Sequence, residues 1–208
     1  MTARGRFISL EGGEGVGKST QVRALAAALQ ERGVGCLVTR EPGGSGGAEA
    51  VRELLLQGDE SRWGAKAEAL LFAAARADHV EKTIRPALEQ GQWVLSDRFV
   101  DSSLAYQGGA GGLGIEAVRA INAFGIGDDF PDRTLVLLLD EGHERARERD
   151  RDAPDRIGGR PREYHHRVET AFRLIAAEEP ERVRVIDASG PPEEVTQRLL
   201  DALKDLLP

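Results

Sequence analysis

The chain has 208 residues, a formal net charge of −7 and 40% hydrophobic residues. That length suits one domain with a substantial core and leaves little room for two, so we expect residues 1–208 to form a single domain. The negative net charge argues against a broad nucleic-acid-binding face.

No apolar run approaches the roughly 20 residues that span a bilayer. A single cysteine, Cys36, excludes a disulfide within the chain. Together with the lack of a signal-peptide pattern, this favours a cytoplasmic protein.

Apolar runs and helical periodicities alternate along the whole chain. Five short apolar runs predict strands at about residues 6–10, 36–39, 93–96, 134–139 and 183–186. Apolar residues at helical spacing predict helices at about residues 18–32, 48–57, 65–89, 115–124, 141 onward, 162–177 and 192–207. Pro86 is expected to kink the third helix or to mark its last turn. The alternation predicts an α/β fold: a doubly wound, five-stranded parallel sheet with helices on both faces.

The strongest local motif lies between the first strand and the first helix. Residues 12–19 read Gly-Gly-Glu-Gly-Val-Gly-Lys-Ser, which matches the P-loop pattern G-x-x-x-x-G-K-[ST]. Its glycines allow the backbone to wrap a phosphate chain with N–H groups pointing inward, and the following helix adds the positive end of its dipole. Lys18 is expected to reach the β- and γ-phosphates, and Ser19 to ligate Mg²⁺. The sequence therefore predicts a nucleoside-triphosphate site.

Among P-loop proteins, the chain fits a kinase for a small acceptor best. The Asn-Lys-x-Asp segment that reads guanine in switch GTPases is absent. An arginine-dense insertion at about residues 149–161 is expected to form a short lid, because phosphoryl transfer relies on positioning and charge stabilisation. Two other classes stay open at this point: a regulatory ATPase without a small acceptor, and a structural domain with a vestigial P-loop.

Separated motifs along essentially the whole chain resemble the thymidylate kinase family. They are residues 11–20, 39–44 (Thr-Arg-Glu-Pro-Gly-Gly), 71–76 (Leu-Phe-Ala-Ala-Ala-Arg), 96–99 (Ser-Asp-Arg-Phe), 102–108 (Ser-Ser-Leu-Ala-Tyr-Gln-Gly), 145–147, 155–157 and 164–165. The resemblance implies a P-loop kinase that transfers the γ-phosphoryl group of ATP to dTMP, with Mg²⁺, to give dTDP for dTTP synthesis. It also implies a homodimer, with the apolar faces around residues 70–71 and 115–124 as candidate interfaces. A kinase preferring dUMP or CMP is the alternative among enzymes.

The resemblance assigns two nucleotide sites, and the residues implied for ATP are Gly12, Gly13, Glu14, Gly15, Val16, Gly17, Lys18, Ser19, Thr20 and, against the adenine, Arg145. The residues implied for dTMP are Glu14, Arg40, Glu41, Phe72, Arg76, Arg98, Ser103, Tyr106 and Gln107. Asp97 is implied to hold Mg²⁺ together with Ser19, because it follows a buried strand where a carboxylate can meet the metal or its waters.

Individual roles at the acceptor site follow from the same resemblance. Phe72 would stack on the thymine, and Arg76, on the same helix face, would donate to a base oxygen. Ser103 and Gln107 could read the polar edge of the pyrimidine, and Tyr106 would crowd the ribose 2′ position. Arg40 and Arg98 would clamp the acceptor phosphate with their planar guanidinium groups. Glu14 would touch the sugar 3′-hydroxyl, and Glu41 would orient the acceptor or the metal's water shell.

The family places a catalytic arginine either in the P-loop or in the lid. Gly15 and Val16 occupy the candidate P-loop positions, so the chain resembles the bacterial type that carries this arginine in the lid. Arg149 or Arg151 would then act with Lys18 and Arg98 in catalysis. Many relatives carry Glu after the Asp-Arg-Ile of residues 155–157, whereas this chain has glycine at positions 158 and 159, which leaves the lid geometry open.

Overall fold

The computed structural model describes residues 4–139 and 156–208, with the side chain of Glu60 left out. Within these ranges it contains one parallel sheet in the order β2-β3-β1-β4-β5. The strands are β1 (Phe7–Gly12), β2 (Cys36–Arg40), β3 (Trp93–Asp97), β4 (Arg133–Leu138) and β5 (Val183–Asp187). The α-helices are α1 (Lys18–Gln30), α2 (Gly46–Leu56), α3 (Ala65–His79), α4 (Arg85–Glu89), α5 (Val100–Ser103), α6 (Ile115–Ile126), α8 (Arg162–Glu178) and α9 (Pro192–Ala202). The predicted five-stranded parallel α/β fold is confirmed.

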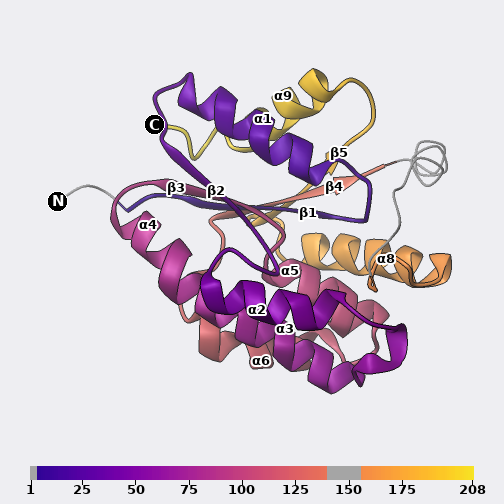
Figure 1. Ribbon diagram of the computed structural model, residues 1–208. Helices are drawn as coiled ribbons and strands as arrows, with labels where there is room; N and C mark the ends of the chain where they lie inside the picture. Colours follow the sequence, from indigo (N-terminus) through magenta and orange to yellow (C-terminus); the bar gives the residue numbers. More distant parts are fainter. Residues whose placement is uncertain (1–3, 140–155) are drawn as a thin grey trace.

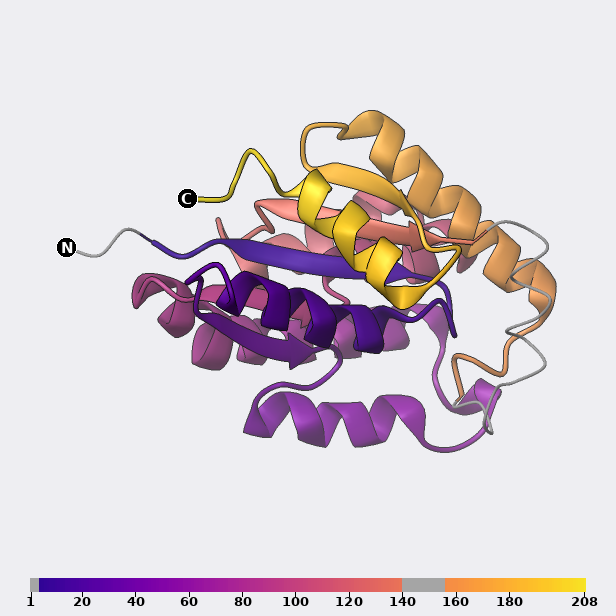
Figure 2. The same cartoon turned by 90° about the horizontal axis from the view of Figure 1, so that it is seen from above.

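Helices cover both faces of the sheet (Figure 1). Helices α1 and α9 lie side by side on one face, as the view from above also shows (Figure 2). There, Leu25 of α1 and Leu199 of α9 join Ile8 and Leu10 of β1 in one buried cluster. Ile8 and Leu10 are two residues apart, so the strand's alternation sends both side chains to the same face.

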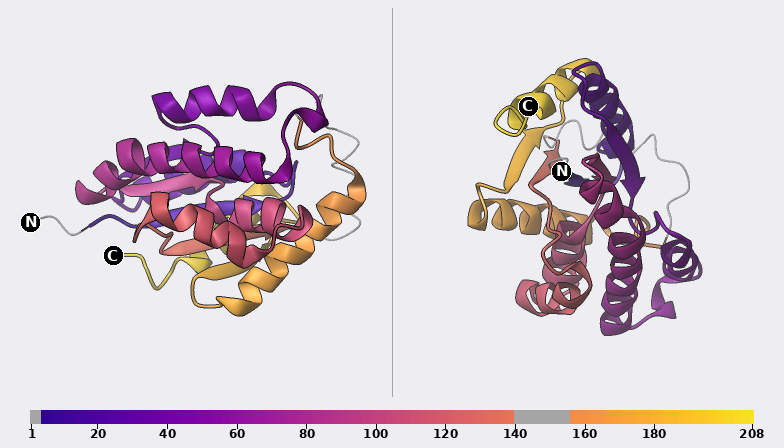
Figure 3. Two further views of the ribbon diagram at one scale, coloured as in Figure 1. Left: turned by 90° about the horizontal axis from the view of Figure 1, so that it is seen from below. Right: turned by 90° about the vertical axis from the view of Figure 1, so that its left-hand side faces the viewer.

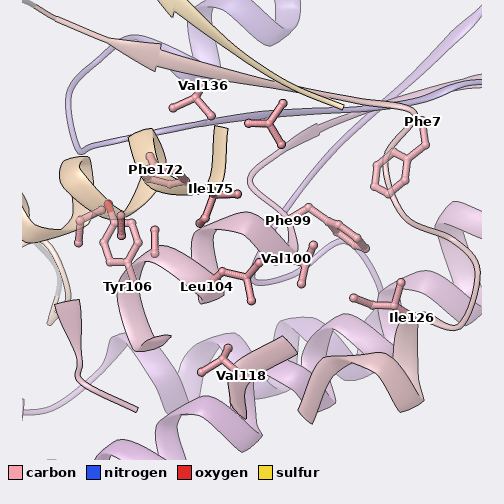
Figure 4. Close-up of a cluster of buried hydrophobic side chains, with 14 of the residues drawn as sticks. Phe7, Phe99, Val100, Leu104, Tyr106, Val118, Ile126, Val136, Phe172 and Ile175 are labelled. Atoms are coloured by element: carbon pink, nitrogen blue, oxygen red, sulfur yellow. The ribbon is translucent and has the colours of Figure 1, made fainter. Parts of the chain in front are cut away.

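A larger core fills the opposite face, with residues from α4, α5, α6 and α8. Phe7 and Phe99 meet edge to face with ring centroids 4.7 Å apart, and Tyr106 meets Phe172 of α8 at 6.4 Å (Figure 4). These aromatic contacts fix the segment after β3, because Phe99 and Tyr106 both belong to it. This face of the sheet therefore supports the residues that follow Asp97.

The predicted helix 65–89 is interrupted. Helix α3 is followed by a π-helical segment, Val80–Ile84, and then by α4. Pro86 lies in the first turn of α4. A proline has no N–H for the preceding turn and its ring crowds the carbonyl four residues back, so a wider turn just before it relieves both problems.

The segment after β3 is more helical than the sequence analysis expected. A π-helical stretch, Leu104–Ala110, extends α5 and includes Gly108 and Gly109, in a region for which the sequence analysis predicted neither a helix nor a strand. These glycines permit close packing. A Cβ at Gly108 would lie 3.1 Å from Ile115 Cα, and one at Gly109 would lie 2.5 Å from Ala171 Cβ of α8. The absence of a side chain thus lets α6 and α8 approach this segment.

Two further predictions fall at the edges of the described residues. The helix expected from residue 141 and most of the lid at 149–161, including Arg145, Arg149 and Arg151, lie outside the described residues. The last helix, α9, ends at Ala202 instead of near residue 207. None of the helices in residues 4–139 and 156–208 is long and apolar enough to cross a membrane.

Candidate active site

The P-loop joins the carboxyl end of β1 to the first turn of α1. Gly12, Gly15 and Gly17 have φ values of +134°, +72° and +97°, a region that favours glycine. Inside this loop, the ammonium group of Lys18 donates hydrogen bonds to the carbonyl oxygens of Gly12, at 3.2 Å, and of Gly13, at 2.6 Å. The loop and the lysine predicted from the sequence are therefore joined by direct hydrogen bonds at the carboxyl end of β1.

Lys18 is buried and carries a perturbed amine. Burial, followed by the nearby charge of Arg98, lowers the pKa of Lys18 from 10.5 to about 8. A buried ammonium group interacts more strongly with a phosphate than an exposed one does, because little water is left around it to screen the two charges.

Ser19 and Asp97 meet at the mouth of the loop. The Ser19 hydroxyl donates to Asp97 Oδ2 at 2.5 Å. The parallel register explains the meeting, since Leu10 of β1 pairs with Asp97 of β3 and both strands end at this edge of the sheet. A hydroxyl and a carboxylate side by side supply the oxygen donors that Mg²⁺ prefers.

Arg98 crosses from the end of β3 to the P-loop. Its backbone has a φ of +73°, which is uncommon outside glycine. Its Nη1 donates to Gly12 O and to Ser102 Oγ, both at 3.0 Å, and its Nη2 donates to Glu14 Oε1 at 2.5 Å. The guanidinium also lies over the Tyr106 ring, 5.1 Å from its centroid. Glu14, assigned to the sugar hydroxyl from the sequence, is thus the ion-pair partner of Arg98 in this structure.

Glu11 holds the unusual turn at Arg98 in place. The Phe99 N–H donates to Glu11 Oε1 at 2.8 Å, and the Ser102 hydroxyl donates to Glu11 Oε2 at 2.5 Å. Burial, with the charge of Asp101 as the second cause, raises the pKa of Glu11 from 4.5 to about 8. Glu11 belongs to the motif at residues 11–20, but the sequence analysis gave it no role. Its signal is a carboxylate inside an otherwise apolar strand.

Arg76 of α3 is almost fully buried. Its Nε donates to Glu41 Oε2 at 2.8 Å and its Nη1 to Ser103 Oγ at 3.0 Å and Asn122 Oδ1 at 2.5 Å. Its Nη2 donates to Phe99 O at 3.0 Å. Four of the five guanidinium N–H groups are therefore engaged by the described residues, which leaves one Nη2–H for a ligand.

Glu41 supports Arg76 rather than standing free at the site. Its second oxygen, Oε1, lies 3.0 Å from His79 Nδ1, and His79 Nε2 lies 2.8 Å from Thr39 Oγ1. Both carboxylate oxygens are thus occupied by side chains of α3. Glu41 also lines the cavity, and the role we predicted for it, in orienting the acceptor or the metal's water shell, stays a prediction.

A second buried carboxylate, Glu68 of α3, was missed by sequence reasoning. Gln107 Nε2 donates to its Oε1 at 3.0 Å, while Arg156 and Arg160 both donate to its Oε2, at 2.6 and 2.7 Å. Glu68 is only 2% exposed. A glutamate among the apolar residues of a helix was the available signal, but the distant arginines could not be assigned to it from the sequence.

Most of these groups border one cavity of about 390 Å³, whereas Glu11 and Glu68 do not line it and contact residues that do. The predicted site residues that line it are Glu14, Gly15, Gly17, Lys18, Ser19, Thr20, Arg40, Glu41, Phe72, Arg76, Asp97, Arg98, Ser103, Tyr106 and Gln107. Of the remaining predictions, Gly12 and Gly13 present their carbonyls to Lys18, and Val16 is buried in the core beneath α1. Arg52 and Leu56 also line the cavity, and the sequence analysis did not identify them.

A P-loop at the carboxyl edge of a parallel sheet, opening into a cavity with buried arginines, defines a P-loop nucleotide kinase. A family model described as thymidylate kinase matches residues 10–199. The chain belongs to the thymidylate kinase family.

Individual relatives agree with this assignment. A thymidylate kinase of Rhizorhabdus wittichii is 60% identical over 98% of this chain and 99% of its own length. One of Rhodopseudomonas palustris is 50% identical over 97% of this chain and 89% of its own length. The crystal structure of thymidylate kinase from Ehrlichia chaffeensis superposes with a TM-score of 0.80 at 32% identity, covering 96% of this chain and 99% of that one. The chain therefore phosphorylates dTMP to dTDP, and the regulatory-ATPase and vestigial alternatives are set aside.

Proposed function

We propose that ATP binds at the P-loop, dTMP binds in the adjoining cavity, and the γ-phosphoryl group passes in line between them. A dTMP phosphate oxygen forms the new bond to the γ-phosphorus while the bond to the β–γ bridging oxygen breaks, which gives dTDP and ADP. No general base is needed, because the acceptor phosphate is already an anion. The observation that carries this proposal is the position of Arg98, which contacts the P-loop at Gly12 O and also lines the acceptor cavity.

The charges at the junction suit this transfer. Lys18 would donate to the β- and γ-phosphates from inside the loop, and Arg98 would donate to the acceptor phosphate from the loop's edge. Arg40 lines the same cavity and is paired with Glu49 at 3.1 Å, a half-exposed ion pair that an incoming phosphate can replace at little cost. Such preorganised cations stabilise charge on the transferred group in the transition state.

The acceptor end of the cavity suits a pyrimidine. Phe72 lines it as a partly buried ring that would stack on the base, and Arg76 would donate its remaining Nη2–H to a base oxygen. Gln107 lines the same cavity and would meet the polar edge of the base. Tyr106, packed against Arg98, would lie against the sugar and leave little room for a 2′-hydroxyl.

The residues at the loop mouth fit Mg²⁺. Ser19 Oγ and Asp97 Oδ2 are hard oxygen donors that already lie 2.5 Å apart, and Mg²⁺ in nucleotide sites takes one or two protein ligands plus phosphates and water. We propose that Ser19 and Asp97 hold the ion directly or through water. When bound, it supplies positive charge to the β- and γ-phosphate oxygens.

Asp97→Asn is expected to raise the Mg²⁺ concentration needed for half-maximal turnover roughly tenfold, because the amide keeps the shape of the side chain but loses its charge. The measurement is the initial rate of ADP release at saturating ATP and dTMP over a Mg²⁺ titration. Asp132→Asn is the matched control, since Asp132 binds Arg6 and the Phe7 N–H at the opposite end of β1. An unchanged Mg²⁺ requirement in Asp97→Asn would remove Asp97 from the metal site.

The lid residues stay predictions. Arg149 and Arg151 as catalytic residues and Arg145 as the adenine contact lie outside the described residues. Loss of a transition-state arginine in phosphoryl transfer costs about 10³–10⁵ in rate. Separate substitution of Arg149 and Arg151 therefore distinguishes the two candidates.

We also propose a homodimer in which a second copy covers the face of α3 and α6. These helices run alongside each other beneath the sheet (Figure 3). Phe124 of α6 is 99% exposed and Leu70 of α3 is 57% exposed, so two large apolar side chains of this pair face solvent in the single chain. Aromatic residues in such positions are typical of interface anchors.

Phe124→Arg is expected to convert the dimer to a monomer, because a charge buried at the centre of an apolar interface has no partner there. Sedimentation equilibrium measures the mass directly against the 22.5 kDa of one chain. Leu174→Arg is the control, since Leu174 is also exposed but lies on α8. A parent protein that sediments as a monomer at all concentrations contradicts the proposal.

A further inference from the structure

We infer that Glu68 is a positioning residue for substrate selectivity: it fixes which end of the Gln107 amide faces the base. The inference rests on the proposal that Gln107 reads the polar edge of the pyrimidine. It adds a residue that does not line the cavity and that sets which class of base is accepted, namely bases with a donor at N3.

Glu68 is held as an acceptor. Its Oε2 receives Nη2 groups from both Arg156, at 2.6 Å, and Arg160, at 2.7 Å. The side chains of Glu68 and Arg156 are 3% and 0% exposed, so this is a buried, charge-assisted contact. Both arginines can only donate, so Glu68 Oε2 is the acceptor of both contacts, and a carboxylate in such ion pairs accepts hydrogen bonds at its other oxygen as well.

An acceptor at Glu68 leaves the Gln107 amide one favourable orientation. Its NH₂ group must face Glu68 Oε1, to which Nε2 donates at 3.0 Å. The opposite orientation would place the amide oxygen against a buried carboxylate and lose this bond. Gln107 lines the cavity, and no side chain or backbone group in the described residues donates to its Oε1. The amide therefore offers an acceptor to the ligand.

This acceptor and the remaining Nη2–H of Arg76 form a complementary pair. Thymine and uracil carry a donor at N3 and an acceptor at O4, so Gln107 Oε1 and Arg76 match them. Cytosine has an acceptor at N3 and an amino group, which is a donor, at C4. Gln107 Oε1 would then face another acceptor, and Arg76 would face another donor. A site built in this way rejects the mismatched base strongly, since its buried polar groups stay unpaired.

The test compares kcat/KM for dTMP, dUMP and dCMP in the parent protein and in Glu68→Gln. A neutral amide at position 68 can donate as well as accept, so Gln107 can turn over. We expect the ratio of dTMP to dCMP to fall at least tenfold, while the ratio of dTMP to dUMP stays within about twofold, because both bases share the N3 donor.

Two further variants separate selectivity from folding. In the double variant E68Q/R156M, the fully buried Arg156 is removed together with its ion-pair partner, so its charge is not left behind in the core if the single variant does not fold. Arg156→Met alone keeps the ion pair between Glu68 and Arg160, and it should keep the parent selectivity. Asp129→Asn is the matched control, because Asp129 also joins two arginines, Arg4 at 2.8 Å and Arg85 at 2.7 Å, away from the cavity.

Gln107→Leu distinguishes the failure of this inference from the failure of base reading itself. If Gln107→Leu abolishes the preference for dTMP over dCMP but Glu68→Gln lowers both substrates by the same factor, Glu68 is only structural and the inference is overturned. If Gln107→Leu leaves the preference unchanged, base reading by Gln107 is wrong and the inference falls with it. Loss of the preference in Gln107→Leu, with no further loss when Glu68→Gln is added, is the expected result.

Discussion

Lys18→Met is expected to lower kcat by about 10²–10³-fold, the usual effect of removing one preorganised donor from a developing charge. Methionine has a similar length and no charge, so it fills the buried position without supplying a donor. The structure motivates this expectation because the Lys18 ammonium lies inside the P-loop, bound to Gly12 O and Gly13 O. The measurement is the initial rate of ADP release at saturating ATP, dTMP and Mg²⁺.

The pH dependence of ATP affinity provides a second readout of the same substitution. The pKa of Lys18 is lowered to about 8, so the free protein holds the ammonium below that pH and loses it above. ATP binds the charged form, and its affinity should therefore weaken as pH rises above about 8, by up to tenfold per pH unit. Lys18→Met should lack this decline.

Lys82→Met controls for the loss of a lysine in general. Lys82 is 58% exposed and pairs with Asp78 on α3, so its replacement should leave turnover and the pH profile unchanged. A kcat for Lys18→Met within threefold of the parent would contradict the assignment of Lys18 to the transferred phosphate.

Arg98→Ala is expected to lower kcat/KM for dTMP by about 10²–10³-fold and to change the KM for ATP much less. Two charge-assisted hydrogen bonds to the acceptor phosphate account for this size. Gly12 O and Ser102 Oγ hold Arg98 Nη1 in place, while the phosphate would replace Glu14 and the Tyr106 hydroxyl, 3.3 Å away, as partners of Nη2. Steady-state rates over a matrix of both substrate concentrations separate the two effects.

Arg98→Lys should recover little of this loss, because an ammonium group cannot reproduce the planar fork that spans these partners. Arg85→Ala is the control, since Arg85 pairs with Asp129 at a distance from the cavity. An effect confined to ATP, with the dTMP dependence intact, would show that Arg98 serves the donor site alone.

Local patterns predicted most of the fold and the position of the P-loop. Helical spacing and short apolar runs placed the five strands and most of the helices within a few residues, and the P-loop motif located Lys18 and Ser19. These features depend on residues that are close together in the sequence, so they can be predicted from one sequence alone. The parallel sheet then brought Asp97 to the P-loop, as its position after a buried strand had indicated.

Long-range pairing was the part that the sequence could not provide. Glu68 and Arg156 are 88 positions apart, and nothing in either segment names the other as a partner. Glu14 and Arg98 were each predicted as ligand-binding residues, yet their ion pair across 84 positions appears only in the fold. The helical extension after β3 was missed because its glycines resemble a turn, whereas they provide close contact with α6 and α8.

The central claim is that two nucleotides meet end to end in one cavity, and a crystal structure with dTMP, Mg²⁺ and a non-hydrolysable ATP analogue tests it most directly. The account predicts the triphosphate inside the P-loop at Lys18, the dTMP phosphate at Arg98 and the thymine ring against Phe72. A thymidine nucleotide bound elsewhere, or one whose phosphate points away from Arg98, would contradict it.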